Sequence, residues 1–469
     1  MFLDNLRRRL LDLEDSVSHQ EHLLQHLKEQ RAAVQLQLDR FVYPILTLPL
    51  EITSEIFLWC SPRDFAADPS EAPMLLLQVC RAWRAIALSV PVLWDSIDDE
   101  FTTPAKMEDV VTSWFSRAGA RLFLKLSYIS DPESAPMHSL IHRHASRLQS
   151  LKLYTHSQCL CDLADIRPFP LLRDLYLCSY NFDMPESTGT PIPVFSGAPL
   201  LRHLSLECIS PSALLMPWSP LTKFSAFELS LLDCLDVLRL ATSLSKFHRH
   251  GVLEAEETGT GQPLHHSGIT SLTVAAGVHS DDDVLPFLTL PCLQEFRLGD
   301  PSHSYNKEMN TRILPFLSRA SATLRTFTVD LLPLLPNELV PIEWFHITTH
   351  LTTLDLAYPQ YMRQFLHALD RRRTPDFLPK LENLVYSKGS SDQVNNQLLD
   401  ALQSRGPDDA PDSDTDTSCA RLETFCQIWP ENVSGLRARI PLEHVASLRA
   451  LVSRRLHIHI GTRDMNTFH

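Results

Sequence analysis

Cysteine and histidine are the side chains of this sequence that could bind a metal ion or supply a nucleophile. Cys159 and Cys161 come closest to a ligand pair, but their one-residue separation is atypical of structural zinc, and no second pair follows at a finger-like interval. Four histidine pairs are similarly unspecific, and the pairs whose members are two apart would merely share a face in a strand. These pairs are His142 and His144, His248 and His250, His265 and His266, and His457 and His459. We expect no metal site and no catalytic residue among them.

The sequence also lacks the motifs with which enzymes hold phosphate or activate a nucleophile. Only 13 glycines occur in 469 residues, and neither GxGxxG nor GxxxxGK[ST] is present. A glycine-rich loop that binds phosphate through its backbone N–H groups is therefore not expected. No GxSxG, HExxH or CxxC appears either. We therefore expect a non-catalytic chain without a cofactor, although spacing alone does not test a triad that folding assembles from distant residues.

The segment from Leu48 to Trp94 offers a different chemistry, that of an apolar binding surface. It reads LPLEITSEIF, then an insert that contains prolines, then LLLQVCRAWRAIALSVPVLW. Pro49 suits the first turn of a helix, and we expect two short helices whose apolar stripes close on each other. The stripes are Ile52, Ile56 and Trp59 in the first helix and Val79, Trp83, Ile86 and Ala87 in the second. The Leu-Pro corner and part of the Trp83 face would remain as a patch that a partner helix covers.

In this order, the residues of the segment resemble an F-box. The matching residues are Leu48, Pro49, Glu51, Ile52, Ile56, Phe57, Val79, Cys80, Arg81, Trp83, Ile86 and Ala87. The resemblance implies docking onto a Skp-type adaptor, which links the chain to a cullin and a RING subunit and so presents a captured protein for ubiquitination. It implies adaptor contacts, or their immediate support, at Leu48, Pro49, Ile52, Ile56, Val79, Trp83 and Ile86.

The F-box resemblance covers about a tenth of the chain. It departs from the usual pattern, because Ser61–Pro73 lengthens the stretch between the two halves. The alternative is a pair of ordinary helices that cap the rest of the fold.

Residues 1–42 predict a long amphipathic helix, since no proline or glycine interrupts them and apolar residues recur at alternating separations of three and four. Only Gln20 and Arg31 break the series, whose positions are Leu3, Leu6, Leu10, Leu13, Val17, Gln20, Leu24, Leu27, Arg31, Val34, Leu38 and Phe41. Two alternatives stay open. The helix forms a coiled coil and thereby a homodimer, or it packs on its own F-box or repeat domain.

Beyond residue 120, a Leu-x-x-Leu-x-Leu hexad recurs at intervals of 20 to 31 residues, with one gap of 41. The hexads begin at Leu148, Leu172, Leu201, Ile269, Leu293, Leu324, Leu351 and Leu381, with fainter copies at Leu221, Leu244 and Leu422. This period is typical of leucine-rich repeats, in which each hexad forms a strand with one buried face. We expect an α/β fold: a long helix and a small helical F-box, followed by an irregular solenoid with a parallel sheet on its concave side.

Three segments near 184–199, 254–267 and 406–418 predict loops that project from the array, because they are rich in proline, glycine and polar residues. The third is strongly acidic, and is either a solvated insert or a contact for a basic partner. The run Arg371 to Arg373 predicts an exposed helix end or loop, with an acidic or phosphorylated target as the alternative.

Composition limits the classes of partner. Hydrophobic residues make up 44% and charged residues 21% of the chain, and the net charge is −14, so broad nucleic-acid binding is not expected. The longest apolar stretch, 284–296, is broken by Pro286 and Pro291, and no membrane span is expected. The scattered cysteines and the absence of a secretory leader predict an intracellular protein, cytoplasmic, nuclear or both.

These patterns divide the chain into a helix at 1–42, an F-box at 43–97 and a repeat array at 98–469. The first hypothesis is a substrate-recognition adaptor of an SCF-type ubiquitin ligase, with the Skp-type adaptor on the F-box and a protein substrate on the repeats. The alternative is a leucine-rich-repeat interaction scaffold with no ubiquitin role. An enzyme comes third, with no motif in support.

Overall fold

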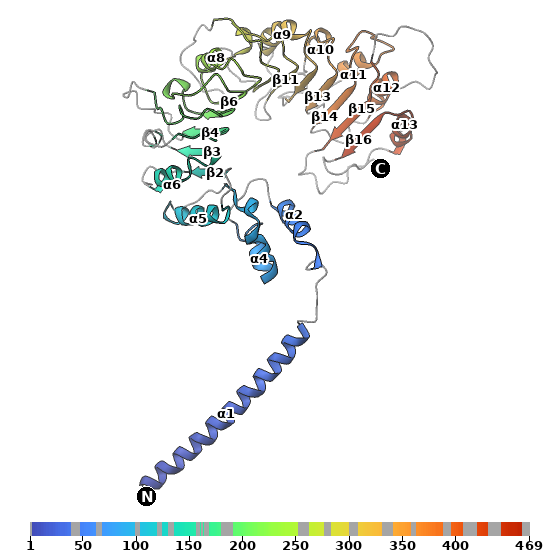
Figure 1. Ribbon diagram of the computed structural model, residues 1–469. Helices are drawn as coiled ribbons and strands as arrows, with labels where there is room; N and C mark the ends of the chain where they lie inside the picture. The colour runs from blue at the N-terminus through green and yellow to red at the C-terminus, as the bar shows by residue number, and fades with distance from the viewer. Residues whose placement is uncertain are drawn as a thin grey trace. The chain divides into compact units, whose positions relative to one another are not determined.

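The structure is a computed structural model of the chain (Figure 1). It describes residues 2–38, 47–61, 68–98, 104–119, 124–129, 136–155, 160, 163, 168–179, 191–251, 262–275, 283–299, 308–330, 341–357, 363–387, 395–406, 420–429 and 442–461. The chain forms two compact units, which are described separately below. The first contains Met1–Ile97 and Trp114–Ala120, and the second contains Asp98–Ser113 and Arg121–His469.

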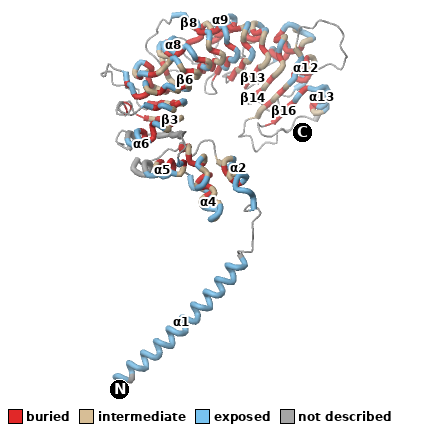
Figure 2. Tube along the Cα trace, in the orientation of Figure 1, coloured by how far each residue is buried: buried red, intermediate tan, exposed pale blue. Residues whose placement is uncertain are grey.

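Helix α1 spans Phe2–Leu38 in the first unit. Its length follows from an unbroken run of good helix formers, and the helix prediction is confirmed. Every side chain described in it is exposed (Figure 2). The exposed set includes the apolar heptad residues Leu3, Leu6, Leu10, Leu13, Val17, Leu24, Leu27 and Val34. Within the described chain, the apolar seam of α1 is therefore uncovered.

Short helices make up the rest of the first unit. They are α2 (Leu50–Cys60), α3 (Leu76–Val79), α4 (Arg81–Ser89) and the 3-10 helix η2 (Pro91–Trp94), followed by the strand β1 (Ser96–Asp98). Pro49 precedes α2 in extended conformation, as expected for a proline at a helix start. The thiol of Cys80 caps α4 by accepting the backbone N–H of Trp83 at 3.4 Å.

A small core holds these helices together. Phe57, Leu76, Ala87, Leu93 and Trp94 are buried in it. The indole N–H of Trp94 donates to the carbonyl of Ala87 at 2.9 Å, so its polar atom is satisfied inside the core. The C-terminal end of helix α5 (Pro104–Arg117) completes this core, because the ring of Trp114 lies 4.8 Å from that of Trp94.

The second unit is built on one sheet, whose strands from β2 to β16 lie side by side almost entirely in chain order. All pairings between these strands are parallel. The strands are β2 (Leu124–Ile129), β3 (Leu148–Thr155), β4 (Asp174–Ser179), β5 (His203–Glu207), β6 (Lys223–Phe227), β7 (Lys246–His250), β9 (Ser271–Val274), β11 (Glu295–Leu298), β12 (Thr326–Val329), β13 (Thr353–Ala357), β14 (Asn383–Ser387), β15 (Thr424–Ile428) and β16 (His457–Gly461).

The predicted solenoid is confirmed. Each hexad contains a strand, and in all but the first the strand starts at the third hexad residue. The first, fourth and sixth residues turn into the core, as Leu201, Leu204 and Leu206 do in β5. Polar residues occupy the sixth position in two repeats, where Arg249 and Gln427 are buried.

Backbone hydrogen bonds join successive repeats just before each strand begins. The carbonyl of the second hexad residue accepts two N–H groups from the next repeat. Arg202, for example, accepts from Thr222 at 2.8 Å and from Lys223 at 3.0 Å. The same pattern continues from Arg173 to Glu382 and fixes the register between neighbouring strands.

Helices and turns cover the convex face of the sheet (Figure 1). They are α6 (Pro136–His144), η3 (Pro211–Ala213), α8 (Leu231–Leu240), η5 (Leu285–Phe287), α9 (Glu308–Ala320), α10 (Glu343–Ile347), α11 (Arg363–Leu369), α12 (Asn396–Arg405) and α13 (Leu442–Ser453). Two short strands, β8 (Leu264–His265) and β10 (Leu288–Thr289), pair in a sheet of their own.

Two of the predicted loops need correction where the structure describes them. In the segment 254–267, Leu264 and His265 form β8 and His266 is buried, so this end packs on the array instead of projecting from it. In 184–199, Ile192 forms a bridge with Leu214 and Phe195 is buried. In both segments, burial of the few apolar side chains stabilises packing on the array although the composition is that of a loop. The acidic segment 406–418 lies outside the described residues apart from Gly406.

Candidate functional site

The seven predicted adaptor-binding residues fall into two groups. Leu48, Pro49, Ile52 and Val79 are exposed, whereas Ile56, Trp83 and Ile86 are half-buried. The half-buried group supports the small core, since the ring of Trp83 lies 5.0 Å from that of Phe57.

The prediction that Ile52, Ile56 and Trp59 close on the second helix is wrong. The stripe of α2 that packs inward contains Thr53 and Phe57, which are buried. Ile52 and Trp59 are exposed, and the indole of Trp59 is 82% accessible. The apolar stripe recognised in the sequence is therefore a surface stripe, one residue away from the packing stripe.

Exposed apolar side chains extend beyond the predicted residues. The set on and beside α2, α3 and α4 is Leu48, Leu50, Ile52, Trp59, Leu75, Val79 and Leu88, and we call it the apolar surface set. Sequence analysis missed Leu50, Leu75 and Leu88 as surface residues. So many large apolar side chains on a unit of this size are typical of a surface that a partner covers.

The concave face of the sheet is the second candidate surface. It displays the third and fifth residues of each hexad and the residue that follows the hexad, because the fourth and sixth turn into the core. Registered pairing brings residues from separate repeats together. His203 of β5 lies opposite Lys223 of β6, which lies opposite Lys246 of β7, which lies opposite Ser271 of β9.

A hollow of about 800 Å³ lies over these strands on the concave face. Six of its lining residues carry cationic or titratable nitrogen: His203, Lys223, Lys246, His248, His250 and Arg297. Glu295 is the carboxylate residue that lines it. A cationic hollow in a chain of net charge −14 marks this face as a site for an anionic group. We call it the lysine hollow.

Some of these cations have partners within the protein. His203 Nδ1 lies 2.5 Å from the carboxylate of Asp174. Arg297 donates to the buried carboxylate of Asp330 at 2.6 Å. Among the described residues, Lys223 and Lys246 have no carboxylate partner within 4.0 Å. The uncompensated charge of the hollow is therefore concentrated on the two lysines.

His248 is neutral in this environment. Burial, together with the positive charges of Lys223, His250, Lys246 and Arg297, lowers its pKa to about 4. The ring of His250 stacks on Phe227 at 4.8 Å. At neutral pH, His248 thus offers a hydrogen-bonding nitrogen and not a charge.

Cysteines on the same face are unsuited to nucleophilic attack. Burial raises the pKa of Cys178 to about 11 and that of Cys208 to about 12, with the carboxylates of Glu207 and Glu228 adding to the effect. The thiol of Cys208 donates to Glu228 at 3.2 Å. Both cysteines are thiols at physiological pH, and a thiol is a poor nucleophile and metal ligand.

Of the four histidine pairs in the sequence, His248 and His250 lie together in the hollow, with ring centroids 6.1 Å apart. Cys159 and Cys161 lie outside the described residues. Within the described part of the chain, no group of three or more His, Cys, Asp or Glu side chains is placed to hold a metal ion. Among the described helices, none combines the length and apolar character needed to cross a membrane.

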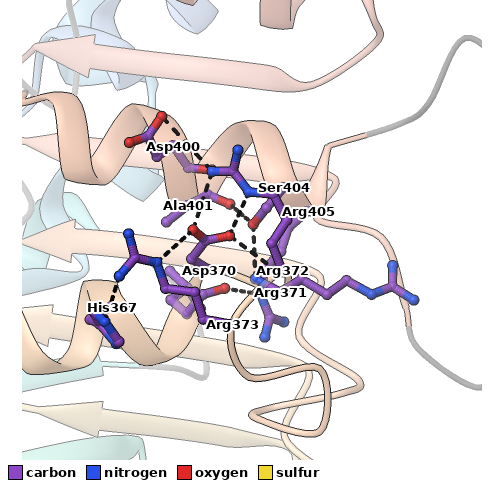
Figure 3. A network of polar contacts seen from close by, with 10 residues as sticks. His367, Asp370, Arg371, Arg372, Arg373, Asp400, Ala401, Ser404 and Arg405 are labelled. Carbon is purple, nitrogen blue, oxygen red and sulfur yellow. Dashed lines mark hydrogen bonds and ion pairs between the residues drawn. The ribbon is translucent and has the colours of Figure 1, made fainter.

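The arginine run follows the end of α11, as expected, and its polar contacts are within the protein (Figure 3). Arg372 donates to the buried carboxylate of Asp370 through Nε at 2.9 Å, and Arg373 Nε lies 3.3 Å from the same group. Burial alone would raise the pKa of Asp370, but hydrogen bonds from Arg372 hold it below its usual value. Two of the three arginines thus stabilise the junction of α11 and α12, where the backbone N–H of Arg371 also donates to Ser404.

No protein-family model and no curated protein matches the chain. Among solved structures, the chain is similar to the leucine-rich repeat-containing protein LegL7 from Legionella pneumophila. The identity is 16% and the TM-score 0.35, over 71% of this chain and 89% of that one. The strands and register described above are those of a solenoid of stacked repeats.

Proposed function

We propose that the chain is a substrate-recognition adaptor of an SCF-type ubiquitin ligase and is not itself an enzyme. In this proposal, α2 to α4 bind a Skp-type adaptor, through which a cullin is recruited, and the concave face of the repeats binds a protein substrate. The chain contributes by proximity, because holding a substrate beside the ubiquitin-loaded enzyme makes transfer effectively intramolecular.

The apolar surface set is the observation that supports this function best. Its members lie on and beside α2, α3 and α4 and remain exposed within the described chain. The F-box resemblance falls on the same helices, and four of the seven residues it selects are exposed. A partner helix that covers Leu50, Ile52 and Val79 would remove their remaining apolar area from water, which is the main favourable term in such association.

A reconstitution experiment tests this proposal. The full chain is co-expressed with a Skp-type adaptor and purified through a tag on the chain. Co-elution of the adaptor in a stoichiometric complex supports the proposal. A folded chain that elutes without the adaptor refutes it, and favours the alternative of an interaction scaffold with no ubiquitin role.

The exposed seam of α1 supports a homodimer as part of the same proposal. In a parallel pair, the heptad places Arg9 of one helix beside Glu14 of the other, and this opposite-charge contact occurs twice by symmetry. Gln20 would form a polar layer in the seam, which fixes register at some cost in stability. A dimeric receptor would present two substrate surfaces and gain avidity for repeated targets.

A further inference from the structure

Two lysines lie opposite each other on the concave face of the sheet. Lys223 and Lys246 are registered partners on β6 and β7, and adjacent strands lie about 4.8 Å apart. Like charges directly opposite each other destabilise a sheet. The pair therefore costs the free chain stability, and a bound anion would offset that cost.

The surroundings of the pair do not supply that anion. Neither lysine has a carboxylate partner among the described residues. Asp174 is already engaged by His203, and Glu295 lies two strands from Lys246, across Ser271. At physiological ionic strength charges are screened over about 8 Å, so the chain's overall negative charge does not neutralise the pair.

The hollow around the pair fits an extended peptide segment. Its volume of about 800 Å³ lies within the range of typical ligand sites. Hydroxyl groups of Thr222, Ser245, Ser271 and Thr273 line it beside the lysines and imidazoles. This lining provides hydrogen-bonding groups for the main chain of a peptide. An anionic side chain of the peptide would lie at the Lys223 and Lys246 pair.

Charge identifies the anion. A single carboxylate carries one negative charge and would leave one lysine uncompensated. A phosphorylated serine or threonine carries about −1.5 to −2 at neutral pH and three acceptor oxygens, which matches two ammonium groups that act as point charges. We infer that the lysine hollow binds a phosphorylated serine or threonine in an extended segment of the protein captured by the repeats. The identification of that segment as substrate rests on the proposed function.

Peptide binding tests the inference with the purified full chain. Three fluorescent peptide libraries with the same short random flanks carry phosphoserine, serine or glutamate at the centre. We expect the phosphoserine library to bind at least about tenfold more tightly than the serine library, as charge-assisted bonds to both lysines would give. The double variant Lys223→Ala, Lys246→Ala should lower its affinity to that of the serine library.

A matched control removes the same charge elsewhere in the repeat unit. The double variant Lys380→Ala, Arg363→Ala changes two exposed cations that do not line the hollow, and should bind all three libraries as the unchanged chain does. The Lys223, Lys246 variant should unfold at the same temperature or higher, because a like-charge contact is lost. Equal binding of the phosphoserine and serine libraries overturns the inference, as does an unaffected double variant.

Two further readouts separate this inference from competing results. If single-stranded RNA or phosphoinositide vesicles bind through the two lysines while the phosphoserine library does not, the inference is overturned. The same double variant should still co-purify with a Skp-type adaptor. Failure of the unchanged chain to bind the adaptor would refute the ligase proposal alone, because phosphopeptide binding is measured without the adaptor.

Discussion

Replacing three exposed apolar residues of the first unit should abolish adaptor binding without unfolding the chain. The variant is Leu50→Ser, Ile52→Ser, Val79→Ser. The side chains are 53%, 50% and 52% exposed in the free chain. About half of each is thus already buried, and the other half is what an adaptor would cover.

The expected magnitude follows from these fractions. Burying a Leu, Ile or Val side chain completely contributes about 1.5 to 3 kcal/mol. Covering the remaining half contributes about 1 kcal/mol per residue, and three residues together about 3 kcal/mol. This is about a hundredfold in Kd. The half that is already buried contributes about as much to folding, so the variant should lose up to about 3 kcal/mol of unfolding free energy, and a control at equally exposed side chains should lose a similar amount.

Isothermal titration of a purified Skp-type adaptor into the full chain measures this change, with urea unfolding as the stability assay. The repeat unit supplies a matched control, Leu215→Ser, Leu232→Ser, Leu240→Ser, at side chains that are 51%, 47% and 52% exposed. The control should bind the adaptor like the unchanged chain. An unchanged Kd in the first variant, or an equal loss in the control, would refute the assignment of the apolar surface set.

Three other predictions concern stability and assembly. Arg405→Met should lower the free energy of unfolding by about 3 kcal/mol or more, measured in urea, because the buried guanidinium donates to the carbonyls of Leu369, Leu378 and Phe377; a loss under about 1 kcal/mol would contradict a structural role. Burial, with neighbouring positive charges, lowers the pKa of His144 and His248 to about 4. Both imidazoles bind protons more readily in the unfolded chain, so the free energy of unfolding should fall as the pH drops from about 6.5 to 4. In a pH series, the free energy of unfolding of the double variant His144→Gln, His248→Gln should fall less steeply. Deleting residues 2–38 should convert a dimer to a monomer in light scattering, whereas a full chain that is already monomeric at micromolar concentration would exclude the coiled coil.

The repeats were predictable from the sequence because the same hexad of buried positions recurs, although the interval varies from 20 to 41 residues. Strands formed even at the fainter hexads of Leu221 and Leu244. The hexad pattern did not predict β16, because Arg455 stands at the first hexad position and the neighbouring Leu456 is buried instead. Short segments such as that around Leu264 were predicted as loops because their composition is mostly polar. Their few apolar residues nevertheless form strand pairs and pack on the array.

The candidate sites were less predictable, for two physical reasons. Helical spacing cannot distinguish neighbouring apolar stripes on one helix, so the inward position of Phe57 and the outward position of Ile52 required the packing of α4 against α2. The lysine hollow depends on register between repeats. Lys223 and Lys246 are 23 positions apart, and only superposition of the hexads shows that both stand at the third position.

Affinity capture of the full chain from cells tests the central claim most directly, with the adaptor and the cullin quantified in the captured material. The proposed function predicts that both are recovered with the unchanged chain and with the Leu215, Leu232, Leu240 control. Both should be lost from the Leu50, Ile52, Val79 variant, while proteins bound to the repeats remain. Recovery of repeat-bound proteins with neither adaptor nor cullin on the unchanged chain would contradict the claim.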